Sequence, residues 1–173
     1  GKGKGDAVRM AFEAARGEVL MILDADLSVA PEYLPRFYDA LRENKGEFIN
    51  GSRLVYQLEK ESMRFLNLFA NKIFGLLFSY LLEQPIKDTL CGTKALFKKD
   101  YEKIAEGRSF FGDFDPFGDF DLLFGACKLN LKIVEIPVRY QARLYGRTNI
   151  SRFRHGLLLL RMCFVAMRKI KFI

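Results

Sequence analysis

The sequence predicts an α/β fold in which a sheet is flanked by helices. Two observations carry this prediction. Amphipathic helical stretches alternate with short apolar runs typical of buried strands, and no internal repeat or low-complexity linker interrupts the alternation. The chain has 173 residues and 50% of them are hydrophobic, so it is long enough for one domain with its own core.

Each predicted element follows from a local pattern. Apolar residues recur at helical spacing over 6–16, where we expect a helix with Gly17 at its C-cap. The apolar run after it predicts a strand that is covered on both faces of a parallel sheet. In chain order, the elements expected next are a strand over 18–23, a helix over 31–44, a strand over 47–50, a helix over 62–82, a strand over 95–97, a helix over 100–105 and a strand over 131–140. Pro137 predicts an edge or bulge position in the last strand, because proline cannot donate a ladder hydrogen bond.

Composition narrows the possible functions. The formal net charge of +7 favours anionic partners, whether phosphates, nucleic acid or an anionic membrane surface. Cys91, Cys127 and Cys163 lie far apart, which indicates buried thiols in a reducing compartment rather than a zinc site or a disulfide framework. His155 is the only histidine, so a histidine-based triad or a multi-histidine metal site is nearly excluded. Carboxylates must therefore carry any proton transfer.

Two apolar segments raise the question of a membrane. The longest charge-free run of the helix over 62–82 is residues 73–82, far shorter than the roughly 20 residues that cross a bilayer. We expect this helix to be buried against the sheet, with a helix in the membrane interface as the alternative. From Ser151 onward, basic residues surround an apolar face and no acidic residue occurs. This pattern predicts a basic amphipathic helix, either interfacial or docked on its own domain.

Asp24 and Asp26 follow the strand over 18–23 directly. In an extended segment residues i and i+2 point the same way, so both carboxylates could approach one hard divalent cation at the carboxyl edge of the sheet. A pair of turn aspartates explains the spacing equally well. The stretch 109–123 adds four aspartates among phenylalanines, and we expect some of them to face a cleft because the rings would otherwise be left in water.

Six short motifs occur in a fixed order: GKG, DAD, GSR, DTLCGTK, FGDFDLL and RYQARLYGRTN. Together they closely resemble the family 2 glycosyltransferases of the GT-A fold, particularly the branch with dolichyl-phosphate mannose synthase and bacterial polyprenyl-phosphate sugar transferases. The resemblance covers essentially the whole chain. It implies a Rossmann-like mixed sheet flanked by helices, truncated at the N-terminus because a preceding nucleotide-binding βαβ half is missing. Residues 1–151 are then the C-terminal portion of a GT-A catalytic domain, and 152–173 the basic helix.

The resemblance also implies roles for residues on the donor side. Asp24 and Asp26 match the family's metal-binding DxD, which holds Mg²⁺ or Mn²⁺ on the diphosphate of a nucleotide sugar. The metal would neutralise charge on the departing nucleoside diphosphate. Lys4 and Gly5 match the segment beside the nucleotide, where a lysine and an unhindered backbone suit a phosphate or a base edge.

Asp88 matches the aspartate proposed as general base in an inverting displacement. Such a base is needed only if the acceptor is a hydroxyl, because a lipid phosphate is already anionic at neutral pH. Asp119 and Asp121 are competing candidates at the start of a helix, and we rank Asp121 second after Asp88. For Asp119 a helix N-cap is the simpler interpretation.

Five further residues match substrate-binding positions in the resemblance. Arg53, Arg64 and Asn67 correspond to the acceptor-phosphate site, while Arg143 and Gly146 correspond to a loop that closes over the diphosphate. A guanidinium can grip phosphate oxygens in a bidentate way, which suits both places.

The resemblance implies an inverting, metal-dependent transfer of a hexose from a nucleotide-diphosphate sugar to a membrane-associated acceptor, with a polyprenyl phosphate as the candidate acceptor. We expect a cytoplasmic enzyme, peripheral to an anionic membrane surface, with no nucleic-acid partner. Because the nucleotide-binding half is missing, we expect this segment alone to bind donor weakly or to be inactive. Two alternatives stay open: a haloacid-dehalogenase-like phosphatase, whose short nucleophile motif DADLS also satisfies, and a non-enzymatic basic module for membrane surfaces.

Overall fold

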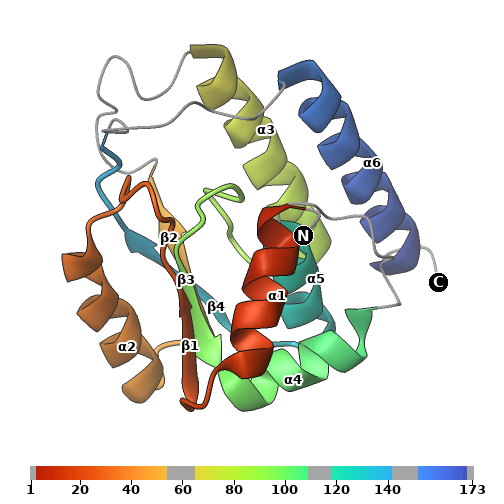
Figure 1. The fold of residues 1–173 in the computed structure, drawn as a ribbon. Coiled ribbons are helices and arrows are strands. Elements are labelled where there is room, and N and C mark those ends of the chain that lie inside the picture. Colours follow the sequence, from red (N-terminus) through yellow and green to blue (C-terminus); the bar gives the residue numbers. More distant parts are fainter. Residues whose placement is uncertain (1–2, 54–64, 109–117, 142–151, 171–173) are drawn as a thin grey trace.

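The computed structural model describes residues 3–53, 65–108, 118–141 and 152–170, with the backbone alone at 65–71, 152–156, 159 and 170. Within these ranges, helices and strands alternate as predicted, except that two described helices follow one another between residues 98 and 128 (Figure 1). The elements are α1 (Lys4–Ala14), β1 (Val19–Ile22), the 3-10 turn η1 (Pro31–Tyr33), α2 (Leu34–Arg42), β2 (Phe48–Ser52), α3 (Phe65–Leu82), β3 (Lys94–Phe97), α4 (Lys98–Glu106), α5 (Asp119–Lys128), β4 (Ile133–Pro137) and α6 (Arg152–Ile170).

The described strands form one mixed sheet in the order β1-β3-β2-β4. β3 runs antiparallel to both of its neighbours, and β2 and β4 are parallel. The expectation of a parallel sheet is therefore wrong for β3, whereas the mixed sheet that the family resemblance implies is confirmed. Since β1, β2 and β4 run in the same direction, they end at one edge, and β3 begins at that same edge. The segments that follow β1, β2 and β4, and the segment that precedes β3, therefore all lie at the same edge of the sheet.

Helices cover both faces of the sheet (Figure 1). Of the described α-helices, only α2 lies on one face, where Phe37 and Leu41 pack on Ile49 and Ala95 (Figure 1). On the other face α1, α4 and α5 lie next to the sheet, and α3 and α6 lie farther out (Figure 1). The larger core cluster fills this second side. The layering follows from the alternation of side chains along each strand, which sends neighbouring residues to opposite faces.

β1 is covered on both faces, as its apolar run predicts. Leu20 and Ile22 are buried in the larger cluster, while Val19 and Met21 are half-buried against the cluster beneath α2. A strand with apolar residues at every position can only be placed where both faces are protected from water.

Three element ends differ from or refine the predictions. Gly17 is not the C-cap of α1, because the helix ends at Ala14 and Ala15 already turns to extended backbone with ψ 138°. β2 continues past Asn50 to Ser52, since the Gly51 amide donates to the Thr93 carbonyl at 2.9 Å. Pro137 ends β4, which pairs only with β2 among the described strands, so its predicted edge position is confirmed.

α3 and α6 pack on each other and on the rest of the fold. Phe78 of α3 stacks on Phe124 of α5 with ring centres 4.9 Å apart and lies 4.8 Å from Phe120, so α3 packs on α5, in the same core cluster as Phe48 and Leu96 of the sheet. α6 buries Met162 and Cys163 in the same core cluster, which matches the docked alternative. Over the described part of the chain, no helix combines the length and apolar character needed to cross a membrane.

Candidate active site at the carboxyl edge of the sheet

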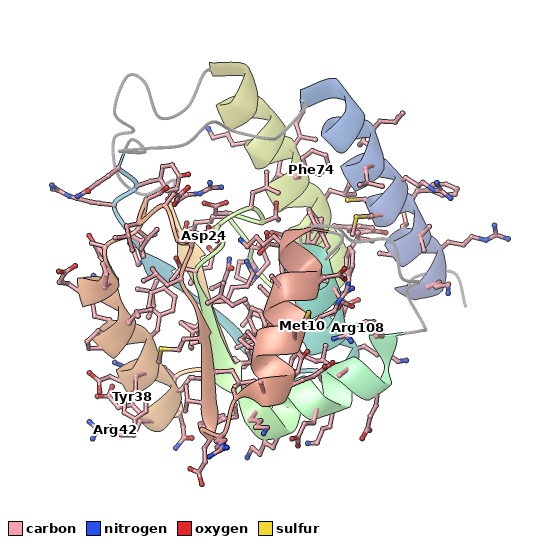
Figure 2. The ribbon with its side chains drawn as sticks, in the orientation of Figure 1. Met10, Asp24, Tyr38, Arg42, Phe74 and Arg108 are labelled. Carbon is pink, nitrogen blue, oxygen red and sulfur yellow. The ribbon has the colours of Figure 1, made fainter. Side chains whose placement is uncertain are left out.

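The candidate residues gather where three strands end and β3 begins. Asp24 follows β1, Arg53 follows β2, and the segment 88–93 leads into β3 at the same edge. Figure 2 shows Asp24 at this end of the sheet, level with the N-terminal end of α1. The strand directions therefore bring together side chains that are far apart in the sequence, as is usual for ligand sites in open α/β sheets.

Lys4 and Asp24 form an ion pair in this site. The Lys4 ammonium lies 2.8 Å from Asp24 Oδ1 and 3.9 Å from Asp119 Oδ2, in the first turn of α1. Burial alone would lower the pKa of Lys4, but the charges of Asp119 and Asp24 outweigh it and raise the pKa above its ordinary value. Lys4 therefore presents a positive charge at every physiological pH.

A second lysine extends the charge pattern into the core. Lys94 is fully buried, and its ammonium lies 2.8 Å from Asp119 Oδ1 and also donates to the Cys91 carbonyl. Asp119 thus lies between two ammonium groups, Lys4 and Lys94. From the core outward the charges alternate in sign, in the order Lys94, Asp119, Lys4 and the partly exposed Asp24. Each buried charge therefore has a neighbour of opposite sign, without which its burial would cost several kcal/mol.

Two glycines let the backbone approach this charged group. A Cβ atom on Gly92 would stand 2.1 Å from Asp24 Oδ2 and 2.5 Å from Lys4 Nζ, so a side chain here would displace this ion pair. Gly118 has φ +74°, and a Cβ there would stand 2.9 Å from the Cα of Gly5. The start of α5 thus meets α1 at Gly5, and both the positive φ and this contact explain the glycine at position 118.

Asp26 lies in a turn and not in an extended segment. The Leu27 amide donates to the Asp24 carbonyl at 3.0 Å, and Leu27 has φ 50°. Asp26 Oδ1 accepts from the Ser28 amide at 3.1 Å and from Ser28 Oγ at 2.5 Å. The expectation that residues 24–26 are extended is wrong, because the chain turns directly after β1. The alternative of turn aspartates describes the local backbone correctly.

Asp88 and Arg53 form a bidentate ion pair on the β2 side of the site. Arg53 Nε donates to Asp88 Oδ2 and Nη2 donates to Oδ1, both at 2.7 Å. The Arg53 amide also donates to Oδ2 and the Leu90 amide to Oδ1. Asp88 is fully buried, and the Arg53 guanidinium lies 5.2 Å from the Tyr140 ring centre. Burial would lower the pKa of Arg53, but the hydrogen bonds and charge of Asp88 raise it overall.

Asp121 is engaged elsewhere in the molecule. Its Oδ2 accepts from Arg108 Nε at 2.7 Å and lies 3.8 Å from Arg9 Nε. Figure 2 shows Arg108 well away from Asp24, beside the lower part of α1. Of the two competing aspartates at the start of α5, Asp119 therefore joins the charged group around Lys4. Asp121 instead pairs with Arg9 of α1 and with Arg108, which follows α4.

Four predicted substrate-binding residues cannot be compared with this arrangement. Arg64, Arg143 and Gly146 lie outside the described residues, and Asn67 is described by its backbone in α3 alone. Sequence reasoning missed Lys94, Gly92 and Glu135 as members of the site. The first two belong to the DTLCGTK motif, and Glu135 is the one charged residue in the strand Ile133–Pro137. A charge within an apolar strand is the signal that could have identified it.

The donor atoms of Asp24 and Asp26 are carboxylate oxygens, which Mg²⁺ and Mn²⁺ prefer. Among the residues described, no group of three or more His, Cys, Asp or Glu side chains is arranged to hold a metal ion. Two carboxylates nevertheless suit Mg²⁺, which usually binds one or two carboxylates and completes its shell with substrate phosphates and water. The donor chemistry of Asp24 and Asp26 therefore fits a metal that is bound together with a diphosphate.

The known proteins that this chain resembles include sugar transferases. The chain is similar to glycosyltransferase AglD of Haloferax volcanii, with 27% identity over 88% of the chain and 23% of the relative. It is also similar to a dolichol-phosphate mannosyltransferase of Pyrococcus furiosus, with 29% identity over 89% of the chain and 44% of the relative. A dolichyl-phosphate hexose transferase of Haloferax volcanii is 28% identical over 90% of the chain and 64% of the relative. The chain thus spans less than two-thirds of the length of each relative.

The family assignment rests on a match to a family model. Residues 1–105 match the model of the family described as glycosyl transferase family 2, and this match includes the ion pairs of Lys4 with Asp24 and of Arg53 with Asp88. It covers more than half of the 173 residues. The chain therefore belongs to glycosyl transferase family 2.

Proposed function

We propose that the whole protein transfers a hexose from a nucleotide-diphosphate sugar to a lipid phosphate such as a polyprenyl phosphate, with inversion at the anomeric carbon. One observation carries the proposal. The Lys4–Asp24 pair and the Arg53–Asp88 pair lie at the same sheet edge, and the loop from Asp88 to Gly92 touches both. A donor diphosphate at the first pair and an acceptor phosphate at the second would be held on one rigid frame, as catalysis by proximity requires.

On the donor side, we propose that Asp24 and Asp26 bind Mg²⁺ or Mn²⁺ and that Lys4 binds the diphosphate. When bound, the metal would supply charge neutralisation for the leaving nucleoside diphosphate. The raised pKa of Lys4 keeps its ammonium charged, so it can bind a phosphate oxygen. Gly92 lets the loop before β3 lie directly against Asp24 and Lys4, and Gly5 lies at the contact of α1 with the start of α5, which supports a role for both in shaping this part of the site. Arg143 and Gly146 remain proposals for the closing loop.

On the acceptor side, we propose that Arg53, with Arg64 and Asn67, binds the lipid phosphate. Both carboxylate oxygens of Asp88 already accept hydrogen bonds from Arg53 and from backbone amides, which supports a role in orienting Arg53. An anionic phosphate needs positioning more than deprotonation, so this role suits a lipid-phosphate acceptor. Proton abstraction by Asp88 stays a prediction for a hydroxyl acceptor, and Asp121 stays the second candidate.

A membrane-facing surface would bring the protein to such an acceptor. On α3, Ile73, Leu76 and Tyr80 are 46%, 74% and 62% exposed. On α6, which packs beside α3, three further apolar side chains are exposed, namely Leu157 at 71%, Leu160 at 52% and Phe164 at 60%. Exposed basic residues lie on the same two helices at Lys72, Arg161 and Arg168. Apolar side chains with cations around them favour an anionic lipid surface, which supports peripheral membrane binding through these helices.

The two other functions are less well supported. A haloacid-dehalogenase-like phosphatase would use Asp24 as a nucleophile, and the family membership of the chain does not favour it. A non-enzymatic membrane module explains the surface of α3 and α6 but not the paired charges at the sheet edge.

The decisive experiment assays the full-length enzyme and this 173-residue segment side by side. Each is incubated with a panel of nucleotide sugars, a short polyprenyl phosphate and Mn²⁺, and the lipid product is separated and its anomeric configuration determined. We expect an inverted glycosyl phospholipid from the full-length enzyme and little or none from Asp24→Asn or from the segment. Free sugar or inorganic phosphate as the only product would contradict the proposal. Equal turnover by the segment would contradict the expected need for a preceding nucleotide-binding half.

A further inference from the structure

Glu135 is the charged residue of β4, and it faces the loop that leads to the site. In the parallel pairing of β2 with β4, Glu135 is the register partner of Asn50. Glu135 Oε1 accepts from the amides of Lys87 and Asp88, both at 3.0 Å, and Oε2 accepts from the Lys87 amide at 3.1 Å. One carboxylate thus binds two successive backbone amides immediately before the site.

Asn50 completes this hold on the backbone of Asp88. Its Nδ2 donates to the Asp88 carbonyl at 2.7 Å and to Glu135 Oε1 at 3.4 Å. The amide and the carbonyl of Asp88 are therefore bound by side chains from two neighbouring strands. Because strands in a sheet are rigid, the position and orientation of Asp88 depend on the β2–β4 pair rather than on the loop.

The fixed backbone of Asp88 in turn fixes the position of the Arg53 side chain. With its backbone held by Glu135 and Asn50, Asp88 presents both oxygens to the Arg53 guanidinium, which has little freedom left in a bidentate pair. A shift of the Asp88 backbone would move the guanidinium with it. Small displacements of a binding group are costly in enzymes, since substrate must be held in a narrow range of geometries.

The choice of a carboxylate at position 135 also needs explanation. Burial raises the pKa of Glu135, the hydrogen bonds from the Asp88 and Lys87 amides and from Asn50 lower it, and the charge of Asp88 raises it. The net change is a rise, so keeping this side chain ionised costs free energy. If residue 135 only held the loop in place for stability, a neutral side chain would do so without that cost. A glutamine keeps one acceptor oxygen but turns a donor toward the Lys87 amide, so only a carboxylate accepts with both atoms.

We propose that Glu135 is a positioning residue for the acceptor phosphate, because it holds the Lys87–Asp88 backbone and thereby directs the Arg53 guanidinium through Asp88. This inference rests on the proposed function, since it assigns Arg53 to the acceptor. It gives Glu135 and Asn50 a role in positioning Arg53 at that site. Neither residue touches the substrate.

The first test compares Glu135→Ala and Glu135→Gln in the full-length enzyme. A matched control is Glu47→Gln, because Glu47 Oε2 also accepts from a backbone amide next to β4, that of Lys132 at 3.0 Å, but at the opposite end of the same strand pair. We expect Glu135→Ala to raise KM for a short polyprenyl phosphate by about 10-fold or more, the effect of losing a hydrogen bond to a charged group. Glu135→Gln should recover part of the loss, and KM for the nucleotide sugar should stay within about twofold in all variants.

The second test reads the position of Arg53 without any turnover. In ¹H–¹⁵N spectra of this segment, the Arg53 Nε–H signal is assigned by its loss in Arg53→Lys. We expect this signal to shift and to exchange faster with solvent in Glu135→Gln, and to be unchanged in Glu47→Gln. The proposal is overturned if the signal keeps its shift and protection in Glu135→Gln, or if donor and acceptor KM rise equally. If the wild-type enzyme transfers no sugar, the proposed function fails while the spectra still decide whether Glu135 positions Arg53.

Discussion

Asp88 and Arg53 are 35 residues apart in the sequence and form a buried, bidentate ion pair in the structure, with both N–O distances at 2.7 Å. Asp88 has no exposed surface, and the Arg53 side chain is 10% exposed. Taking two charges out of water is expensive, so the pair is maintained by its geometry and by the backbone amides that share the carboxylate. Removing either partner leaves an uncompensated buried charge.

We expect Asp88→Asn and Arg53→Met each to lower the free energy of unfolding by about 3–5 kcal/mol, as for other broken buried pairs. The double variant should be less destabilised than the sum of the two, because it buries no unpaired charge. Urea unfolding of the four proteins in a double-mutant cycle measures this coupling. Additive effects would show that the pair is not coupled. The control is Arg42→Met at the exposed pair with Asp39, which is expected to cost about 0–1 kcal/mol.

Gly92 tests how closely the loop before β3 must approach Asp24 and Lys4. In Gly92→Ala the new methyl group would collide with Asp24 Oδ2 and Lys4 Nζ, so both side chains must move. We expect weaker binding of a nucleoside diphosphate in Mn²⁺, measured by calorimetry on the full-length enzyme, and a loss of about 1–3 kcal/mol in unfolding free energy. Gly17→Ala is the control, since its nearest contact would be an ordinary 3.6 Å. Unchanged binding in Gly92→Ala would contradict a ligand role for this pair.

Two buried cysteines predict how stability changes at alkaline pH. Burial raises the pKa of Cys91 to about 11 and that of Cys163 to about 12, from an ordinary 9.0. The unfolded chain therefore releases these protons first, so the stability that they contribute is fully present below pH 9 and is lost as pH rises toward about 12. The stability difference between wild type and Cys163→Ala, followed by urea unfolding, should fall over that interval.

Alkylation provides an independent measurement on the same thiols. At pH 8 iodoacetamide should leave Cys91 and Cys163 unmodified in the folded protein, since both are buried and the thiolate is the reactive form. Peptide mapping after a timed reaction gives the result. Rapid modification of Cys163 before unfolding would mean that α6 opens readily from the core.

The exposed apolar residues of α3 and α6 predict membrane binding by the folded protein. Leu76→Glu and Phe164→Glu should each reduce co-sedimentation with vesicles that contain anionic lipid, because both side chains lie on this surface at 74% and 60% exposure. Tyr38→Glu is the control, as Tyr38 is 46% exposed on α2, on the other side of the sheet (Figure 2). If the same two variants instead abolish a dimer seen by light scattering and vesicles are not bound, a second copy covers this surface.

The sequence was sufficient for the elements and for the candidate residues near them. Helical spacing over 6–16, the apolar run before Asp24 and the proline at 137 each predicted an element within a few residues of its place. These signals are local, because backbone propensity and the alternation of apolar side chains act over a few residues. The order of the motifs also pointed to the family before any contact was known.

Only the tertiary structure decided which candidate side chains meet. The reversal of β3 between β1 and β2 brings Gly92 against Asp24, and the start of α5 directs Asp119 rather than Asp121 toward Lys4. The pairing of β2 with β4 places Glu135 behind Asp88. Hydrogen bonds and ion pairs between distant segments depend on strand order and on the direction of each side chain, and neither is encoded in local periodicity. For this protein the sequence determined the elements and the family, and the packing of strands from distant parts of the chain determined the geometry of the site.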